Sequence, residues 1–583
     1  MPTLEWIGKE KVINHHQEVP FRVLERQYSF DKFGIHKEDN RSKNKIIHGD
    51  NLEALKALLP EYEGGIKCIY IDPPYNTGNE GWVYNDNVND PKIKKWLGEV
   101  VGKEGEDLSR HDKWLCMMYP RLKLLQKLLA NEGVIFISID DAEYANLKLI
   151  CDEIFGVNCF VSNISWQRTY STRNDSKGIV NEVEHILVYS KQPGWSPNKL
   201  PRTEEMNSIY KNPDNDKKPW ASDNPFAPGA ATHQGMVYAI QHPFTGKLIY
   251  PSSGACWRYQ QEQMLEIMHG WCEYELRDLN DAHQRAVICG ISDEEVRQGV
   301  KGIVLSESLE ASAKKAQEIY DRGRWPRFYF TKGGKGGIRR KTYLENVGGR
   351  LPTNFWPFAE TGHTDEAKKE LLSIFGGRTT FDTPKPRRLL EFILRIGGDQ
   401  ETLILDSFAG SATTAHAVLA MNKADGGDRR FILIEMMDYA DRITAERVKR
   451  VITGYGEGKN AVEGTGGSFS YYELGEPLFI GEKLNPAVEK DKISRYIWYM
   501  ETHQPMEKCQ NKNLYYLGKH NGTAYYFCYD PDHPCVLDYA FLSTIAQKAD
   551  SYIIYADRCM LSREELLKFG ITFKKIPRDI ARL

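Results

Sequence analysis

The sequence predicts an α/β protein built on a parallel sheet with helices on both faces. Short and almost wholly apolar segments alternate with helical stretches in two separate parts of the chain, 46–139 and 402–435. Strands buried on both faces have this continuous apolar character, and alternation of strand and helix is typical of parallel sheets. Four of these segments lead into a carboxylate, at Asp50, Asp72, Asp406 and Glu435. Ligands bind at the carboxyl ends of parallel strands, so this edge is the expected site.

The first half of the sheet is expected between residues 46 and 139. The apolar runs predict strands, and apolar residues at helical spacing predict the helices between them. The second strand must end before Pro73 and Pro74, because neither proline can donate to a sheet. The expected elements are strand 46–49, helix 51–59, strand 66–71, helix 113–130 and strand 133–139.

Later segments continue this pattern after one long interruption. Two further strands are expected over 160–166 and 185–190, the second at an edge of the sheet. Between 196 and 350 the periodicity is weak and Pro, Asn, Gly and Trp are frequent, which predicts a loop-rich insert. A glycine-rich linker over 454–467 then precedes a small separate domain. Between the insert and this linker the expected elements are strand 402–406, helix 414–420 and strand 431–435.

Charge and composition limit the classes of function. The 583 residues carry 77 Lys and Arg against 80 Asp and Glu, so nucleic-acid binding would need a local basic patch. No apolar run reaches the roughly 18–20 residues that span a bilayer, and the first residues show no signal-peptide pattern, so we expect a cytoplasmic protein. The 11 cysteines form no C-x-x-C pair. No metal is expected, because the candidate zinc ligands Cys509, Cys528, His533 and Cys535 lack paired spacing.

A candidate catalytic motif, Asp72-Pro73-Pro74-Tyr75, follows the second strand. The exocyclic amine of a base is a poor nucleophile, because its lone pair is delocalised into the ring. The Asp72 carboxylate and the Pro73 carbonyl could accept its two hydrogens and free the lone pair to attack a sulfonium methyl group. Tyr75 offers a ring on which an extruded base could stack. A plain turn after a strand is the alternative.

A second motif joins a strand to a helix through small residues. Small side chains let a ligand approach the backbone and the helix amino terminus, which suits the carboxylate of an amino-acid moiety. Glu435, at the end of the next strand, could bind ribose hydroxyls as in dinucleotide-binding folds. The alternative is a tight turn that binds nothing. The motif consists of Asp406, Ser407, Phe408, Ala409, Gly410 and Ser411.

Both motifs resemble those of the amino-group DNA methyltransferases. Residues 72–78 look like the catalytic motif of that family, and 406–411 look like its S-adenosylmethionine motif. The catalytic motif comes first, which is the β-group order. Over roughly residues 1–455 the chain resembles the modification (Mod) subunit of type III restriction-modification systems and its solitary relatives, although Ala412 stands where many relatives carry Gly. The segments that carry this resemblance are 46–75, 114–122, 138–141 and 381–386.

The resemblance implies a permuted Rossmann-like methyltransferase sheet with an inserted target-recognition domain and a small C-terminal α/β domain. The strands that end in Asp406 and Glu435 are expected beside the Asp50 strand, and then the Asp72 strand. The implied parts are an N-terminal arm (1–45), the catalytic half (46–195), the target-recognition insert (196–350), the cofactor-binding half (351–455) and a C-terminal accessory domain (456–583).

The resemblance also assigns residues to roles. Its implied cofactor is S-adenosylmethionine, and its implied catalytic residues are Asp72, Pro73, Pro74 and Tyr75. The residues expected to bind the cofactor are Asp50, Asp406, Phe408, Ala409, Gly410, Ser411, Glu435, Lys385 and Pro386.

The insert contains a glycine-rich basic loop that suits contacts to DNA phosphates. A solvated surface loop is the alternative. The candidate DNA-binding residues of this loop are Lys332, Lys335, Arg339, Arg340 and Lys341. Further candidates of the same kind are Arg168, Arg173 and Lys177.

These observations predict a site-specific DNA methyltransferase that flips adenine out of the duplex and methylates its N6 amine, in a restriction-modification or phage-defence setting. Cytosine-N4 methylation uses the same chemistry, but Asp rather than Ser at position 72 favours adenine in the family. A DNA-reading specificity subunit with little catalysis is a second alternative. RNA or protein amide methylation is disfavoured, because the glutamine-modifying relatives carry Asn in place of Asp72. The expected partners are double-stranded DNA, a second copy of the chain and a helicase-nuclease (Res-type) subunit.

Overall fold

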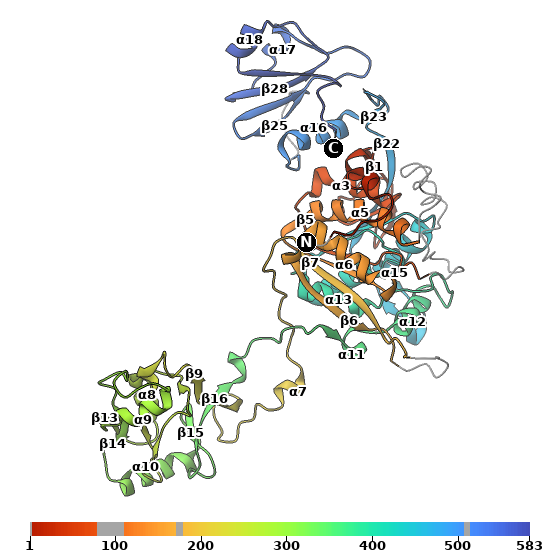
Figure 1. Cartoon of the computed structure of the whole chain (residues 1–583). Helices are drawn as coiled ribbons and strands as arrows, with labels where there is room; N and C mark the ends of the chain where they lie inside the picture. The colour runs from red at the N-terminus through yellow and green to blue at the C-terminus, as the bar shows by residue number, and fades with distance from the viewer. Residues whose placement is uncertain (1–2, 78–109, 171–178, 507–513, 583) are drawn as a thin grey trace. The chain divides into compact units, whose positions relative to one another are not determined.

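The computed structural model describes residues 3–77, 110–170, 179–506 and 514–582. The chain divides into two compact units, one made of 1–198 and 352–583, the other of 199–351. The larger unit contains the sheet that the sequence predicts (Figure 1).

Within the described residues, an 11-stranded sheet forms the centre of the larger unit. Its order is β17 (Phe355–Trp356), β6 (Phe160–Gln167), β7 (Val183–Ser190), β5 (Leu129–Ile139), β4 (Ile66–Ile71), β18 (Leu403–Asp406), β19 (Arg430–Glu435), β3 (Lys45–His48), β22 (Ser468–Pro477), β1 (Arg22–Asp31) and β2 (Gly34–His36). The strands from β5 to β22 run parallel. On either side of this block, β7 and β1 run antiparallel to their neighbours. The predicted α/β class with a permuted parallel sheet is therefore confirmed.

Two groups of helices cover opposite faces of this sheet. Ile135 and Ile137 of β5 share one core with residues of the first group, whereas Gly397 in the second group lies against Val134 and Phe136. Successive residues of a strand point to opposite faces, so the two groups lie on different sides. The first group is α3 (Asn51–Tyr62), α5 (Arg110–Leu128) and α6 (Asp141–Phe155); the second is α13 (Arg387–Gly397), α14 (Thr413–Asp425) and α15 (Glu446–Thr453).

The strand order differs from the prediction in two places. The β18 and β19 strands, which end in Asp406 and Glu435, lie between the Asp72 strand and the Asp50 strand, rather than beside the Asp50 strand alone. The strand expected at a sheet edge, β7, lies between β5 and β6, and β17 extends the sheet further. Both differences arise because remote segments pair with one another, which a local pattern does not reveal.

The two ends of the chain also contribute to the central sheet. The predicted N-terminal arm contains β1, and the region assigned to the C-terminal domain contains β22; these strands pair with each other and β22 pairs with β3. The hydroxyls of Ser29 and Ser470 lie 2.8 Å apart across the β1–β22 pair. The sheet therefore extends beyond both predicted boundaries, because long antiparallel pairing satisfies the backbone of an otherwise open edge.

The rest of the C-terminal region has a small α/β fold of its own. Its strands β26 (Thr523–Phe527), β28 (Ser551–Ala556) and β30 (Ile571–Lys575) are parallel to one another. The α16 helix (Lys490–Thr502) packs against this sheet through Tyr496 and Trp498. Among the described residues, no helix has the length and apolar character to cross a membrane. The strand order is β25 (Tyr516–His520), β26 (Thr523–Phe527), β28 (Ser551–Ala556) and β30 (Ile571–Lys575).

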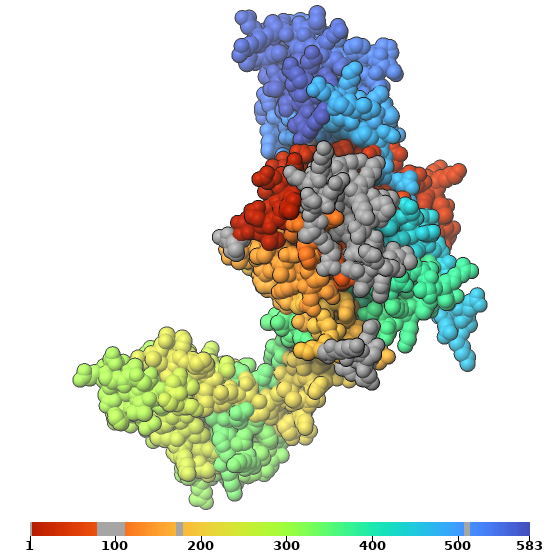
Figure 2. Space-filling model, turned by 45° about the vertical axis from the view of Figure 1, so that its right-hand side comes forward, coloured from red at the N-terminus to blue at the C-terminus, as the bar shows by residue number. Residues whose placement is uncertain are grey.

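Residues 199–351 fold around an aromatic core, and Figure 2 shows them as one continuous yellow-to-green body. Trp220, Trp257 and Trp271 are buried in this core. The strands are too short to produce a clear periodicity, so the sequence shows only the loops. The two main sheets are β11 (Leu248–Ile249), β10 (Ile240–Gln241), β14 (Gly302–Leu305) and β13 (Tyr274–Arg277), and β15 (Phe328–Phe330), β16 (Ile338–Tyr343) and β8 (Trp220–Asp223).

Candidate active site

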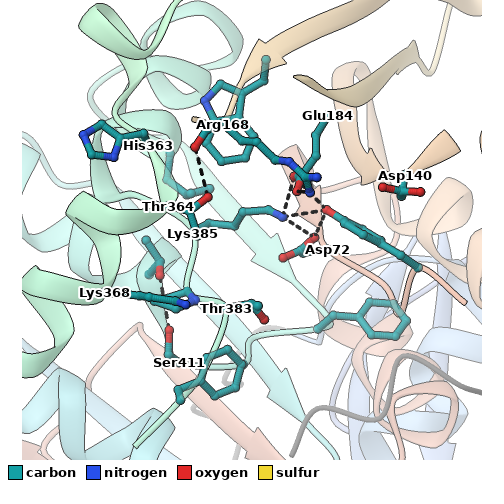
Figure 3. Close-up of a pocket in the computed structure, with 18 of the residues that line it drawn as sticks. Asp72, Asp140, Arg168, Glu184, His363, Thr364, Lys368, Thr383, Lys385 and Ser411 are labelled. Carbon is teal, nitrogen blue, oxygen red and sulfur yellow. Dashed lines mark hydrogen bonds and ion pairs between the residues drawn. The ribbon is translucent and has the colours of Figure 1, made fainter. Parts of the chain in front are cut away.

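A cavity of about 780 Å³ opens at the carboxyl ends of the parallel strands, and residues of both predicted motifs line it (Figure 3). The motifs meet because β4 and β18 are neighbours in the sheet. This is the edge at which open α/β sheets bind their ligands. The lining residues from the two motifs are Asp72, Pro73, Tyr75, Asp406, Phe408, Ala409, Gly410 and Ser411.

The segment after β4 is held in place by two helices. Trp114 of α5 is fully buried and its indole N–H donates to the Pro74 carbonyl at 2.7 Å. Asn76 adopts a left-handed φ of 57°, which asparagine tolerates better than most residues. Its amide donates to the buried carboxylate of Glu143 on α6 at 2.5 Å. The conformation of this motif therefore depends on side chains outside it.

Charged and hydroxyl groups converge around Asp72 (Figure 3). The Tyr75 hydroxyl donates to Asp72 Oδ1 at 2.7 Å. Lys385 Nζ lies 3.1 Å from the same oxygen and donates to the Tyr75 hydroxyl at 2.6 Å and to Glu184 Oε2 at 3.0 Å. Arg168 donates to Glu184 Oε1 at 2.9 Å. Lys385, which the sequence assigned to the cofactor, thus contacts the proposed catalytic motif.

Burial and charge oppose each other in this cluster. Burial raises the pKa of Asp72, and the Lys385 cation acts against that rise. Burial also acts to raise the pKa of Glu184, but the Lys385 and Arg168 cations outweigh it and hold this pKa below its usual value. Burial acts to lower the pKa of Lys385, but Asp72 and Glu184 keep it above its usual value. Asp72 is therefore a hydrogen-bond acceptor whose charge depends on one lysine.

The turn after β18 is tied to two carboxylates. Asp406 Oδ1 accepts from the Phe408 backbone N–H at 3.1 Å, and Oδ2 accepts from the Thr414 hydroxyl at 2.6 Å. Gly410 has a left-handed φ of 49° and donates its N–H to Glu435 Oε2 at 2.8 Å. A Cβ atom at Gly410 would lie 3.1 Å from the Phe381 ring. The glycine therefore keeps this part of the cavity open.

Burial raises the pKa of both carboxyl groups to about 7. For Asp406 the Thr414 hydroxyl and the Phe408 N–H act against that rise. For Glu435 the backbone N–H groups of Met437 and Gly410 do so. Two carboxyls at the ends of β18 and β19 thus titrate near neutral pH.

Ala412 adopts a left-handed φ of 64° at the start of α14, where it is fully buried. This conformation costs a residue with a Cβ atom roughly 1–2 kcal/mol. The strain gives a physical reason why glycine would suit this position better than alanine.

Arg447 of α15 supports the same turn from within the core. Its guanidinium donates to the Ser411 carbonyl at 3.2 Å, to the Ser411 hydroxyl at 3.0 Å and to the Thr413 hydroxyl at 2.8 Å. Its other amino group lies 3.3 Å from Glu370. A buried arginine that makes so many contacts fixes the turn by charge-assisted hydrogen bonds.

Two predicted cofactor residues occupy structural positions. Asp50 caps α3 by accepting from the Leu52 and Glu53 backbone N–H groups, and it pairs with Arg121 at 3.2 Å. Pro386 is the N-cap residue of α13. In the described part of the chain, the cavity lining includes none of Asp50, Pro386 and Glu435, and both Glu435 oxygens accept from backbone N–H groups, those of Gly410 and Met437.

The predicted DNA-binding residues fall into different environments. Lys332 and Lys335 are exposed, Arg339 donates to the Ser222 hydroxyl at 3.1 Å, and Arg340 pairs with Asp223. Arg168 belongs to the cavity and not to this loop. Three residues named from the sequence lie outside the described residues: Arg173, Lys177 and Cys509.

The prediction that Lys341 contacts DNA is wrong. Its side chain is completely buried, and Nζ contacts Asp214 Oδ2 at 2.5 Å, Asp216 Oδ2 at 2.7 Å and the Trp325 carbonyl at 2.8 Å. Lysine at this position compensates buried carboxylates inside the smaller unit, so it cannot reach a phosphate.

Sequence reasoning missed Glu184 and Arg447. Glu184 lies in a strand whose other residues are mostly apolar. A charged residue is rarely buried unless it is paired, so its presence in such a run was the signal for a partnered, buried carboxylate. Arg447 lies on a helix rich in charged residues, where the sequence offers no sign that this one is buried.

Comparison with known proteins matches residues 66–446 to the model of a protein family described as DNA methylase. The chain is 32% identical over 504 residues to the type III restriction-modification enzyme StyLTI Mod subunit of Salmonella typhimurium. This match covers 81% of this chain and 66% of that protein. It is 28% identical over 467 residues to the EcoPI Mod subunit of Escherichia phage P1, covering 74% and 63%.

A third relative is the type II methyltransferase M.KpnI of Klebsiella pneumoniae, 29% identical over 399 residues, covering 68% of this chain and 81% of that protein. The match spans slightly less than two thirds of the length of the two Mod subunits. The family model spans more than half of the chain and contains both motifs that line the cavity. The chain belongs to the DNA methylase family.

Proposed function

We propose that this chain is a site-specific DNA methyltransferase that transfers a methyl group from S-adenosylmethionine to the N6 amine of adenine in duplex DNA. The observation that carries the proposal is the meeting of Asp72 and Tyr75 with the Asp406–Ser411 turn in one cavity. The first motif suits an amine, and the second suits a nucleoside that bears an amino-acid group. Methyl transfer to a base amine requires both ligands side by side.

The second motif is suited to S-adenosylmethionine. The cavity of about 780 Å³ falls within the roughly 300–1,000 Å³ of typical ligand sites. Gly410 leaves room beside Phe381, and Asp406 lines the cavity with a carboxylate for hydroxyl or ammonium groups. Glu435 lies outside the lining against the Gly410 turn, and we propose that it reaches the ribose hydroxyls from there. When bound, this cofactor supplies a methyl group on a positively charged sulfur, which leaves as a neutral thioether.

Asp72 and Pro73 prepare the amine for attack. The Pro74 carbonyl is already bonded to Trp114, so the Asp72 carboxylate and the Pro73 carbonyl are the acceptors for the two amine hydrogens. Accepting both hydrogens favours a tetrahedral nitrogen, whose lone pair forms the new N–C bond as the carbon–sulfur bond breaks. The methylated nitrogen then loses one proton, and Asp72 is positioned to take it because burial raises its pKa. The Tyr75 ring stacks on the extruded base.

Adenine is proposed over cytosine because Asp stands at position 72, where the resemblance associates Ser with cytosine. Cytosine N4 is the same kind of amine and is the alternative product. The two bases differ in size and in the groups beside the amine, so product identification separates them.

The names of the relatives support a restriction-modification setting. Two relatives are named Mod subunits of type III restriction-modification enzymes, and a third is named a type II methyltransferase. We infer that double-stranded DNA is the substrate and that a helicase-nuclease (Res-type) subunit is a partner. The homodimer stays a prediction from the family resemblance.

Residues 199–351 are proposed as the target-recognition domain. They form a compact unit with their own core, and Lys332 and Lys335 are exposed on the glycine-rich loop before β16. Exposed lysines on such a loop suit contacts to the DNA backbone, which position a protein without reading its sequence.

Base-resolved sequencing of duplex DNA incubated with the full chain and S-adenosylmethionine tests this function. We expect N6-methyladenine at one recurring sequence, and none with Asp72→Ala. Detection of N4-methylcytosine instead would show that cytosine, the alternative, is the methylated base. Specific DNA binding without any methyl transfer would overturn the proposal in favour of a specificity subunit.

A further inference from the structure

Glu184 is a buried carboxylate that the proposed reaction does not use. It lies on β7 with 7% of its side chain exposed, and each of its oxygens faces a cation (Figure 3). Oε2 lies 3.0 Å from Lys385 Nζ, and Oε1 lies 2.9 Å from Arg168 Nη1. Burying a carboxylate is costly unless such partners are present. Glu184 therefore fixes the positions of two cations at the wall of the cavity.

Lys385 links Glu184 to the Asp72 motif. Its ammonium group lies within 3.1 Å of oxygens on three side chains: Asp72, Tyr75 and Glu184. A lysine has three N–H donors, so these oxygens account for all of them. The ammonium also lies 4.9 Å from the centre of the Tyr75 ring, on which the extruded base is proposed to stack. The location of this one cation thus affects both the charge of Asp72 and the placement of Tyr75.

We propose that Glu184 is a positioning residue for methyl transfer, which holds the Lys385 ammonium against Asp72 and Tyr75 so that Asp72 stays ionised and Tyr75 stays in place. This inference rests on the proposed function. Glu184 acts through Lys385, whose contacts are the shorter ones, and also accepts directly from the Tyr75 hydroxyl at 3.3 Å; Arg168 holds the other oxygen of the Glu184 carboxylate.

Two effects of Glu184 on the pKa of Asp72 have opposite signs: the direct effect of its negative charge, and the effect of holding the Lys385 cation in place. Lys385 is the cation that lowers the pKa of Asp72 against its burial, while Glu184 is a like charge that raises it. Tyr70 of β4, Tyr75 and Asp406 of β18 also face Asp72. Loss of the Glu184 charge alone would lower the pKa of Asp72. Loss of the Lys385 anchor would raise it, because the cation would leave.

Two substitutions separate these effects. Glu184→Gln removes the charge but keeps an oxygen that can accept from Lys385, whereas Glu184→Leu removes both. In single-turnover methyl transfer measured from pH 5 to pH 9, we expect the acid limb to move to lower pH in Glu184→Gln and to higher pH in Glu184→Leu. We expect Glu184→Leu to lower the maximal rate by about 10²-fold, the size of effect that misplacement of an active-site group by about 1 Å can cause. If both substitutions move the limb to lower pH, Glu184 acts by its charge alone and the proposal is overturned.

A double-mutant cycle with Lys385→Met tests whether Glu184 acts through Lys385. If it does, most of the loss of rate caused by Glu184→Leu disappears once Lys385 is gone, and only the effect of the long bond from the Tyr75 hydroxyl remains. Additive losses would overturn the proposal. The wild-type protein is measured in the same assay. If it shows no methyl transfer, the proposed function fails; if it is active, the variants test the role of Glu184 alone.

Glu501 provides a matched control for loss of stability. In the C-terminal fold it also joins a lysine and a tyrosine: Lys574 Nζ lies 2.5 Å from Oε1, and the Tyr555 hydroxyl bonds to the same oxygen. Glu501→Leu should lower the unfolding midpoint by an amount similar to Glu184→Leu, yet leave the pH profile of methyl transfer unchanged. An equal shift of the profile in both variants would mean that general destabilisation causes it, which would overturn the positioning role.

Discussion

The backbone N–H of Gly410 donates to the Glu435 carboxylate at 2.8 Å, which joins the turn after β18 to the end of β19. Glu435 and Asp406 are buried beside this turn, and burial raises the pKa of each to about 7. Asp406 lines the cavity and Glu435 lies outside its lining, bonded to the Gly410 turn, so two carboxyl groups at the proposed cofactor site change charge within the physiological pH range. The way these groups titrate should be visible in ligand binding.

Cofactor affinity should rise between pH 6 and pH 8. Ribose hydroxyls and an ammonium group donate to an ionised carboxylate, so binding favours the deprotonated forms of Asp406 and Glu435 and releases protons near pH 7. Titration calorimetry at pH 6, 7 and 8 in buffers of different ionisation enthalpy measures both effects. Glu435→Gln should reduce the pH dependence. Equal affinity at pH 6 and pH 8 would contradict the placement of the cofactor.

The stability of the protein without cofactor should fall as the pH rises, whereas cofactor affinity rises. These two groups have raised pKa values in the folded state, so their contribution is most favourable below about pH 4 and is lost as pH rises through about 7. Denaturant unfolding of the cofactor-free protein between pH 5 and pH 8 provides this control.

Asp72→Asn should separate binding from chemistry. The amide keeps the size of the side chain but is a weaker acceptor, so the amine hydrogens lose most of their stabilisation in the transition state. We expect the single-turnover rate to fall by about 10²-fold or more, with cofactor affinity within about twofold of wild type, because Asp406 and Glu435 are unchanged. A rate close to wild type would refute the role assigned to Asp72.

Ala412→Gly should leave the protein at least as stable as wild type. Glycine removes the strain of the left-handed φ, roughly 1–2 kcal/mol, and loses about 0.8 kcal/mol of buried methyl group. Ala415→Gly is the matched control within α14, where the same change should cost about 1 kcal/mol or more. Chemical denaturation of both variants gives the difference, and a lower stability for Ala412→Gly than for Ala415→Gly would contradict this account.

Lys332→Ala with Lys335→Ala should weaken binding to all duplexes alike. Each lost phosphate contact should reduce the slope of log affinity against log salt concentration by about one. Fluorescence anisotropy at several salt concentrations, with and without the recognition sequence, measures this slope. An unchanged slope would mean that this is a solvated surface loop that does not contact DNA phosphates.

Lys341→Ala should behave differently from the two loop lysines. It would leave Asp214 and Asp216 without their cation, a loss of about 3–5 kcal/mol for a broken buried pair. We expect destabilisation of the smaller unit, seen as a lower unfolding midpoint, rather than a change in the salt slope of the folded protein.

The local pattern of residues was enough to predict five strands of the parallel block, the carboxylates that end four of them and the two motifs, but not β22, which lies beyond the predicted boundary. Runs of apolar residues, the prolines after Asp72 and the small residues around Gly410 act over a few positions, so their structural effect can be read along the chain. The family resemblance added the roles of these motifs and the permuted order of the two halves.

Only the tertiary structure decided which strands are neighbours and which charges are paired. Glu184 and Lys385 are 201 positions apart and meet in the cavity, and Lys341 is buried against carboxylates 125 and 127 positions away. The physical reason is that a charged side chain is stable in the interior only beside a compensating group. Whether that group is present depends on how remote segments pack, so the sequence revealed Lys385 and Lys341 as cations but not what they contact.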